Sequence, residues 1–152
     1  MSGPLGERRA PLADVGPHPV LAPRPPGAIW ICDGEAPDVE GATRLRIAPE
    51  RWWLVIDGDV PARPAPLTDV SHGITRLRVR GPHAEAVLSS GISLDLHPKV
   101  FAVGTAAATA YRSIFVVLHR TDGAAFDVYT PRSTASSLWE WLADAAAGCP
   151  PA

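Results

Sequence analysis

The stretch that decides the fold reads Ile74-Thr75-Arg76-Leu77-Arg78-Val79-Arg80. Successive side chains of a β-strand point to opposite faces, so this alternation predicts a strand with one apolar face and one arginine face. The arginine face could be solvated, which discourages edge pairing, or it could contact a partner subunit, and the sequence favours neither. We therefore name Arg76, Arg78 and Arg80 as candidate partner contacts.

Two amphipathic helices are predicted after this strand. The first starts at Gly81-Pro82 and ends at Gly91, which is expected to supply a left-handed stop. The second begins near Ser133 or Thr134, either of which could cap it, and ends before Gly148. Their apolar stripes are Ala84, Val87 and Leu88 in the first helix, and Leu138, Trp141, Leu142 and Ala145 in the second.

Short β-branched or aromatic runs between turn residues predict further strands. Asp122-Gly123 suits a tight reversal between the last two, which indicates antiparallel pairing. We predict an α+β fold, with a mainly antiparallel sheet and two helices packed on one face. The expected strands are Ala28–Cys32, Thr43–Ile47, Trp52–Ile56, Thr105–Tyr111, Ile114–His119 and Ala125–Thr130.

Length and proline content predict the domain organisation. A chain of 152 residues fits one domain of ordinary size. Residues 1–27 are predicted to be a Pro-rich N-terminal arm, because proline lacks the amide donor that a helix or central strand requires. Such an arm could become ordered on a neighbouring subunit. Residues 28–148 are expected to form the single domain, followed by a tail at 149–152.

Composition narrows the class of protein. A net charge of −2 gives no general attraction to nucleic acid or to an anionic membrane. The longest apolar run, 114–118, is far shorter than the ~20 residues of a membrane-spanning helix. The first residues lack the apolar segment of a secretory signal, so we expect a cytoplasmic protein. Cys32 and Cys149 are expected to be free thiols.

Asp69, Ser71 and His72 carry the residue types of a hydrolase. In an extended segment, however, Ser71 and His72 point to opposite faces, whereas a base must lie roughly 2.6–3.2 Å from its nucleophile. We expect Asp69 and Ser71 to bond nearby backbone amides instead. The sequence predicts no catalytic residue in this chain.

Asp95 and His97 are two residues apart and could face the same way, as metal ligands do. A third ligand is missing, so we predict no metal site and expect a corner ending at Pro98, with His97 bonded to backbone. No glycine-rich phosphate loop is present either. We therefore predict no cofactor-binding residue in this chain.

Two residues near the last helix are further candidate partner contacts. Arg132 precedes the helix, where a cation suits a specific salt link better than the helix dipole. Trp139 lies off the apolar stripe while Trp141 lies on it, which predicts an exposed Trp139 at an interface. The alternative for Trp139 is burial under the Pro-rich arm.

Taken in order, the motifs from residue 67 to about 146 resemble the gamma subunit family of heterotetrameric sarcosine oxidase. The segment Pro49–Leu54 is similar more loosely, and Thr134 stands where the family often has an aromatic residue. The motifs are Leu67-Thr68-Asp69-Val70-Ser71-His72-Gly73, Leu94-Asp95-Leu96-His97-Pro98, Phe126-Asp127-Val128-Tyr129, Pro131-Arg132-Ser133 and Leu138-Trp139-Glu140-Trp141-Leu142.

The resemblance implies a non-catalytic gamma subunit with a fold similar to part of the glycine-cleavage T-protein. It implies partners: a large alpha subunit and an FAD-bearing beta subunit, which together demethylate sarcosine or a related N-methyl amine in sarcosine catabolism and one-carbon metabolism. FAD, FMN, NAD and tetrahydrofolate are implied for the other subunits. Two alternatives stay open, a folate-binding one-carbon-transfer protein of the T-protein type and a stand-alone adaptor.

Overall fold

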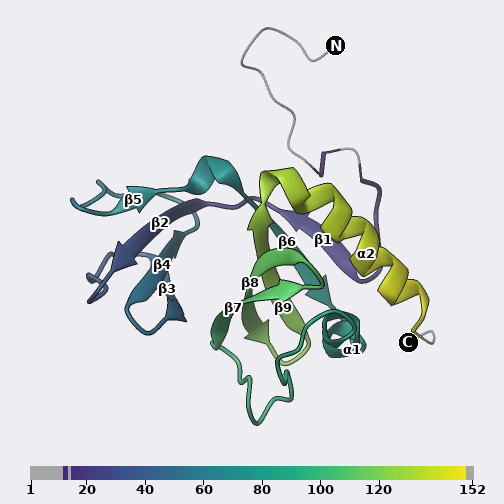
Figure 1. The fold of residues 1–152 in the computed structure, drawn as a ribbon. Helices are drawn as coiled ribbons and strands as arrows, with labels where there is room; N and C mark the ends of the chain where they lie inside the picture. The colour runs from purple at the N-terminus through teal and green to yellow at the C-terminus, as the bar shows by residue number, and fades with distance from the viewer. Residues whose placement is uncertain (1–11, 14, 150–152) are drawn as a thin grey trace, which may run out of the picture.

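The computed structural model describes residues 12–13 and 15–149, which form two antiparallel sheets and two α-helices (Figure 1). The larger sheet has the strand order β1-β6-β9-β8-β7, and the smaller sheet has the order β3-β4-β2-β5. The strands are β1 Leu21–Arg24, β2 Ala28–Asp33, β3 Ala42–Ala48, β4 Arg51–Ile56, β5 Thr68–Asp69, β6 Ile74–Arg80, β7 Ala106–Tyr111, β8 Ile114–Asp122 and β9 Ala125–Pro131. The helices are η1 Ser71–Gly73, α1 Ala84–Ser89, η2 Arg132–Thr134 and α2 Ala135–Ala147.

Strand β6 lies between two partners in the larger sheet and has the predicted bounds. It pairs with β9 along its whole length, and with β1 on its other side through Leu21 opposite Val79. The end of the expected arm is thus extended, but it pairs within this chain. Pro23 is tolerated in β1 because this strand lies at the sheet edge, where one row of amides needs no partner.

Alternation along the strands separates two apolar layers. Leu77 of β6, Leu118 of β8 and Val128 of β9 face the two α-helices in the main core. Val117 and Tyr129, on the opposite face, pack against the smaller sheet. Figure 1 shows both helices on one side of the larger sheet and the smaller sheet on the other. The antiparallel α+β fold with helices on one face is confirmed, whereas the division into two sheets was not predicted.

The smaller sheet has its own apolar layer on its far side, where Trp30, Leu54 and Ile56 pack together with Cys32. Cys32 and Cys149 are both free thiols. Neither α1 nor α2 is long and apolar enough to cross a membrane, and the same holds for every helix in the described part of the chain.

Helix α2 follows η2 at the predicted position and ends before Gly148. The burial of its two tryptophans is the reverse of the prediction. Trp139 is only 8% exposed and belongs to the main core, whereas Trp141 is half-buried. The Trp139 ring meets the His18 ring edge-on at 6.2 Å. The prediction of an exposed Trp139 is therefore wrong, because the segment before β1 covers this flank of the helix. Trp141 instead lies under the Arg112 guanidinium, 5.2 Å from its ring centre.

Gly91 follows helix α1, but it does not have the left-handed conformation that was predicted for it. Its role is close packing, since a Cβ placed on Gly91 would lie 2.6 Å from the ring of buried Tyr111. The Tyr111 hydroxyl is fixed by a 2.7 Å hydrogen bond with the Ser90 hydroxyl. The ring therefore has little freedom to move aside.

We predict that Gly91→Ala destabilises the fold by about 1–3 kcal/mol, because the added methyl overpacks the site against Tyr111. Thermal unfolding followed by circular dichroism measures the effect. Gly123→Ala is the matched control, since Gly123 also has an ordinary φ and nothing lies within 4 Å of its Cβ position. Equal melting temperatures for the two variants would contradict the packing role of Gly91.

Candidate functional site: the ion-pair cluster around Asp127

The arginine face of β6 is not a uniformly solvated row. The Arg76 side chain is 5% exposed and the Arg78 side chain 31% exposed, whereas Arg80, at the strand end, is exposed. The prediction of an outward-facing Arg76 is wrong because the end of β1 and the turn after β4 cover this part of the face. Arg76 donates from Nη1 to the Pro25 carbonyl at 3.4 Å and to Asp57 Oδ1 at 2.8 Å.

Asp127 of β9, which is fully buried, lies at the centre of this face. Its Oδ2 accepts hydrogen bonds from Arg76 Nε at 3.1 Å and Nη2 at 2.6 Å, and from Arg24 Nη1 at 3.0 Å. Its Oδ1 accepts a bond from Arg78 Nε at 3.0 Å. Both carboxylate oxygens are thus occupied by guanidinium groups. We call Arg24, Asp57, Arg76, Arg78 and Asp127 the Asp127 cluster.

The protonation states in this cluster follow from burial and charge. Burial alone would raise the pKa of Asp127, but the attraction of Arg76 and the hydrogen bonds from Arg76 and Arg78 outweigh it, so the pKa lies below its ordinary value. Burial raises the pKa of Tyr129 far above its usual range and lowers the pKa of His119. Asp127 is therefore a poor proton acceptor near neutral pH. The side chains of the cluster therefore stay ionised, and no nucleophile lies beside a base among them.

The sequence analysis missed Asp127 and Arg24 as members of a site. A partial signal for Asp127 was available, because alternation places its side chain on the face of β9 opposite to Phe126 and Val128, and a carboxylate that is covered on that face needs cationic partners. Asp127 also shares the sheet face of Arg78, its partner in register. No comparable signal pointed to Arg24, which lies in the Pro-rich segment.

The Asp69–Ser71 pair makes local bonds, as predicted. Asp69 Oδ1 accepts the Ser71 hydroxyl at 2.5 Å and the Ser71 amide at 2.9 Å, and Ser71 Oγ accepts the Ile29 amide at 2.8 Å. These bonds hold the pKa of Asp69 below its ordinary value, the hydroxyl bond contributing most. His72 is exposed and is not a partner of Ser71. Asp69 and Ser71 therefore fasten β5 and η1 to β2.

Asp95 and His97 are likewise used inside the chain. Asp95 Oδ1 accepts the His97 amide at 2.9 Å, and His97 Nδ1 accepts the Lys99 amide at 3.1 Å. The expectation of a corner with His97 bonded to backbone is confirmed. Within residues 12–13 and 15–149, no group of three or more His, Cys, Asp or Glu side chains is arranged to hold a metal ion.

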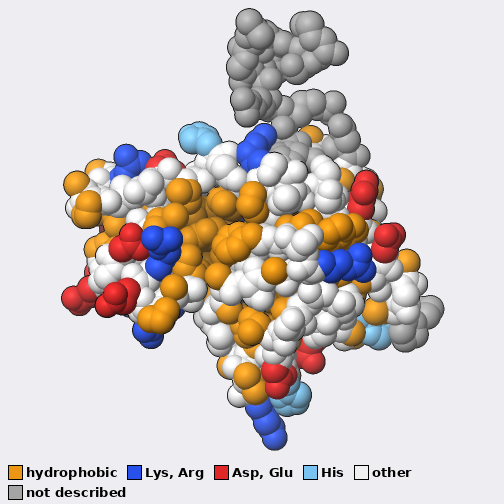
Figure 2. Space-filling model, in the orientation of Figure 1, with side chains coloured by type: hydrophobic (Ala, Val, Ile, Leu, Met, Phe, Trp, Pro, Cys, Tyr) orange, Lys and Arg blue, Asp and Glu red, His pale blue; other side chains and the backbone are white. Residues whose placement is uncertain are grey.

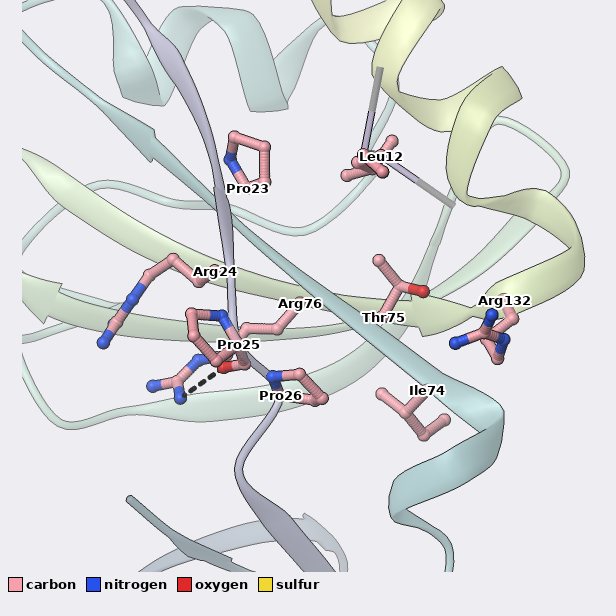
Figure 3. A pocket seen from close by; sticks show the side chains of 10 residues that line it. Leu12, Pro23, Arg24, Pro25, Pro26, Ile74, Thr75, Arg76 and Arg132 are labelled. Atoms are coloured by element: carbon pink, nitrogen blue, oxygen red, sulfur yellow. Dashed lines mark hydrogen bonds between the residues drawn. The ribbon is translucent and has the colours of Figure 1, made fainter. Parts of the chain in front are cut away.

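A pocket of about 270 Å³ lies next to the cluster, between the Pro-rich segment and β6. Figure 3 shows Pro25 and Pro26 on one side of it and Thr75 on the other, with Arg132 at the far end. The pocket is mostly apolar and lies below the ~300 Å³ at which small-molecule sites begin. The Thr75 hydroxyl is buried and has no hydrogen-bond partner among the described residues.

A wider hollow of about 600 Å³ is also lined by Arg24. Asp57, Asp69 and Ser71 line it, and each of the three is engaged in the bonds described above. These three side chains therefore serve the fold, whereas His72, which also lines the hollow, is exposed. Neither cavity brings together a nucleophile, a base and a free cation.

Removing the charge of Asp127 should strongly destabilise the fold. We predict that Asp127→Asn costs about 3–5 kcal/mol of unfolding free energy, because Arg76 stays buried and loses its main counter-ion. Chemical denaturation provides the measurement. Asp33→Asn is the matched control, since the Asp33–Arg51 ion pair is exposed and should contribute little. Similar losses in the two variants would show that burial does not set the importance of Asp127.

The lowered pKa of Asp127 also predicts a pH dependence. A depressed folded-state pKa contributes stability that is fully present above the unfolded value of about 3.9 and is lost as pH falls through the folded value. The difference in unfolding free energy between wild type and Asp127→Asn should therefore shrink below about pH 4. A difference that stays constant from pH 7 to pH 3 would contradict the ion-pair assignment.

Comparisons with known proteins agree on one family. The model of the Sarcosine oxidase, gamma subunit family matches residues 64–148. The curated sarcosine oxidase subunit gamma of Corynebacterium sp. (strain U-96) is 30% identical over 152 residues, which cover 93% of this chain and 73% of that protein. Those of Corynebacterium sp. (strain P-1) and Arthrobacter sp are 33% and 34% identical, and each alignment covers 66% of this chain and 51% of the relative.

A solved structure shows the same fold. It is a chain of the heterotetrameric sarcosine oxidase from Corynebacterium sp. U-96 in complex with pyrrole 2-carboxylate, with a TM-score of 0.77 and 23% identity. The superposition covers 95% of this chain and 99% of that chain. Since the family model spans more than half of the sequence and the U-96 relative aligns with nearly all of it, this chain belongs to the sarcosine oxidase gamma subunit family.

Proposed function

We propose that this chain is the non-catalytic gamma subunit of a heterotetrameric sarcosine oxidase-type complex and that it stabilises the large alpha subunit. The complex would oxidatively demethylate sarcosine or a related N-methyl amine. The observation that carries the proposal is the family match, together with a fold likeness over almost the whole of a chain from a solved heterotetramer.

The use of the polar side chains supports a structural role. The groups that could carry chemistry in other proteins, Asp127, Ser71 and His97, are each engaged in hydrogen bonds within this chain. Catalysis needs groups that are free to meet substrate or to exchange protons with it. These three side chains therefore serve the fold and are not free to meet a substrate.

We infer that the cofactors belong to the other subunits: FAD, FMN and NAD for oxidation, and tetrahydrofolate on a T-protein-like alpha subunit. The pocket beside the Asp127 cluster, at about 270 Å³, is too small for a flavin nucleotide. The inferred partners are the alpha subunit and an FAD-bearing beta subunit, in the cytoplasm.

The candidate partner contacts differ in how far they are buried, and only the accessible ones can reach a partner. Arg76 and Trp139 are buried within this chain, so we do not retain them. Arg78 is largely committed to Asp127, whereas Arg80 is exposed and Arg132 is half-buried beside α2. We retain Arg80 and Arg132 as candidate partner contacts.

Affinity purification from the native organism tests the proposal. We expect the tagged chain to co-elute with a large subunit and an FAD-bearing subunit in equal amounts, as identified by mass spectrometry, and the eluate to oxidise sarcosine or another N-methyl amine. A chain that elutes without a flavoprotein would support the stand-alone adaptor instead.

Titration of the isolated chain with tetrahydrofolate is the companion control. A structural subunit should show no saturable binding in calorimetry, because no described cavity offers a free polar set for the pterin. Saturable binding would favour the alternative of a one-carbon-transfer protein.

A further inference from the structure

We propose that His18 is a pH-sensitive switch. In its neutral form the ring holds residues 15–20, which we call the β1 corner, against helix α2, and protonation of the ring releases the corner and uncovers Trp139. Figure 1 shows the chain passing beside α2 before it enters β1 at the edge of the larger sheet. The inference goes beyond the function proposed above and does not depend on it, because it concerns contacts within this chain only.

The hydrogen bonds of the His18 ring define its protonation state. Nδ1 accepts the Val20 amide at 3.1 Å and the Leu21 amide at 3.2 Å. A neutral imidazole has one nitrogen that donates and one that accepts, whereas both nitrogens of the imidazolium donate. Since both partners are N–H donors, Nδ1 carries no proton in this arrangement. A proton on Nδ1 would place a donor against two donors and break both bonds.

Little else fixes the β1 corner. Pro17 and Pro19 flank His18 and have no amide donor. Within the described chain, residues 16–19 make no backbone–backbone hydrogen bond. The corner is otherwise held by the partial burial of Val15 and Val20 against the main core and by the Val20 carbonyl, which accepts the Arg80 amide at 2.8 Å. The path of the chain between Gly16 and Val20 therefore depends on the His18 ring.

The β1 corner covers one flank of helix α2. The His18 ring meets the Trp139 ring edge-on, with the ring centres 6.2 Å apart, and Trp139 is only 8% exposed. Strand β1 itself has separate anchors, because it pairs with β6 and Arg24 is bound to Asp127. Release of the corner therefore exposes the Trp139 indole and leaves the larger sheet intact.

The charges around the corner do not oppose this switch strongly. The arginines of β1 and β6 lie on the sheet face opposite α2, where Asp127 binds three of them. Helix α2 carries Glu140 and Asp144, both exposed, and Arg112 lies over Trp141 of the same helix. Figure 2 shows acidic and basic side chains on the surface around α2. No ion pair joins His18 to a charged group in the part of the chain that the structure describes.

The direction of the pH effect follows from these bonds. Only the neutral ring can accept the two amides, so the closed corner is favoured at higher pH and is lost as pH falls. The imidazole side chain changes its charge between about pH 5 and pH 8. Asp127 stays ionised over this range, because its pKa lies below its ordinary value. The Asp127 cluster therefore holds the rest of the fold while the corner opens.

Amide hydrogen exchange of the full chain, followed by NMR, tests the switch. The protection factors of the Val20 and Leu21 amides should be at least about tenfold lower at about pH 5 than at about pH 8, since the loss of two typical hydrogen bonds suffices for a tenfold change. The Trp139 indole resonance should shift with the same midpoint. Equal protection at both pH values overturns the proposal. A parallel loss at the Leu77 amide of β6 indicates general acid unfolding and overturns it as well.

Three variants assign the titration to His18. Asparagine offers an oxygen acceptor that does not titrate, so protection in His18→Asn should not change between the two pH values. His18→Ala lacks the acceptor and should show low protection at both. His72→Asn is the matched control, because His72 is exposed, and it should respond like wild type. A pH response that persists in His18→Asn, disappears in His72→Asn, or is accompanied by wild-type protection in His18→Ala overturns the assignment.

Discussion

The carboxylate of Asp127 is the constraint on which the fold depends. It accepts hydrogen bonds from three arginines of β1 and β6, and Arg76 extends the network to Asp57 after β4. Both sheets and the Pro-rich segment therefore share one set of charges. A buried ion pair adds little net stability compared with apolar packing, but losing one member leaves an uncompensated charge. Detachment of the Pro-rich segment would remove Arg24 and the Pro25 carbonyl from this network.

Periodicity in the sequence predicted most of the elements, though not β1 and β5, and it could not predict what covers them. The bounds of β6 follow from its alternation, and both helices and the β8–β9 hairpin follow from stripes and turn residues. Alternation assigns Arg76 and Arg78 to one face of β6. Whether that face is exposed to solvent depends on β1 and on the smaller sheet, which are distant in sequence. The same reason explains Trp139, which is buried by residues more than a hundred positions earlier.

The side chains that resembled catalytic or metal-binding residues instead make hydrogen bonds that connect parts of the fold. Ser71 and Asp69 join the smaller sheet to the entry of β6, and His97 shapes the α1–β7 loop. The sequence indicates that these side chains bond to the backbone, but only the structure shows which backbone groups they bond to. A structural role is also the function proposed for this member of the sarcosine oxidase gamma subunit family.

The central claim is that this chain is a rigid subunit whose effect is exerted on a larger partner. The most direct measurement is the thermal unfolding of the isolated alpha subunit with and without a saturating amount of this chain. A ligand that binds only the folded state raises the melting temperature, so the account predicts an increase that saturates at one chain per alpha subunit. An unchanged melting temperature, or oxidation of an N-methyl amine by this chain alone, would contradict it.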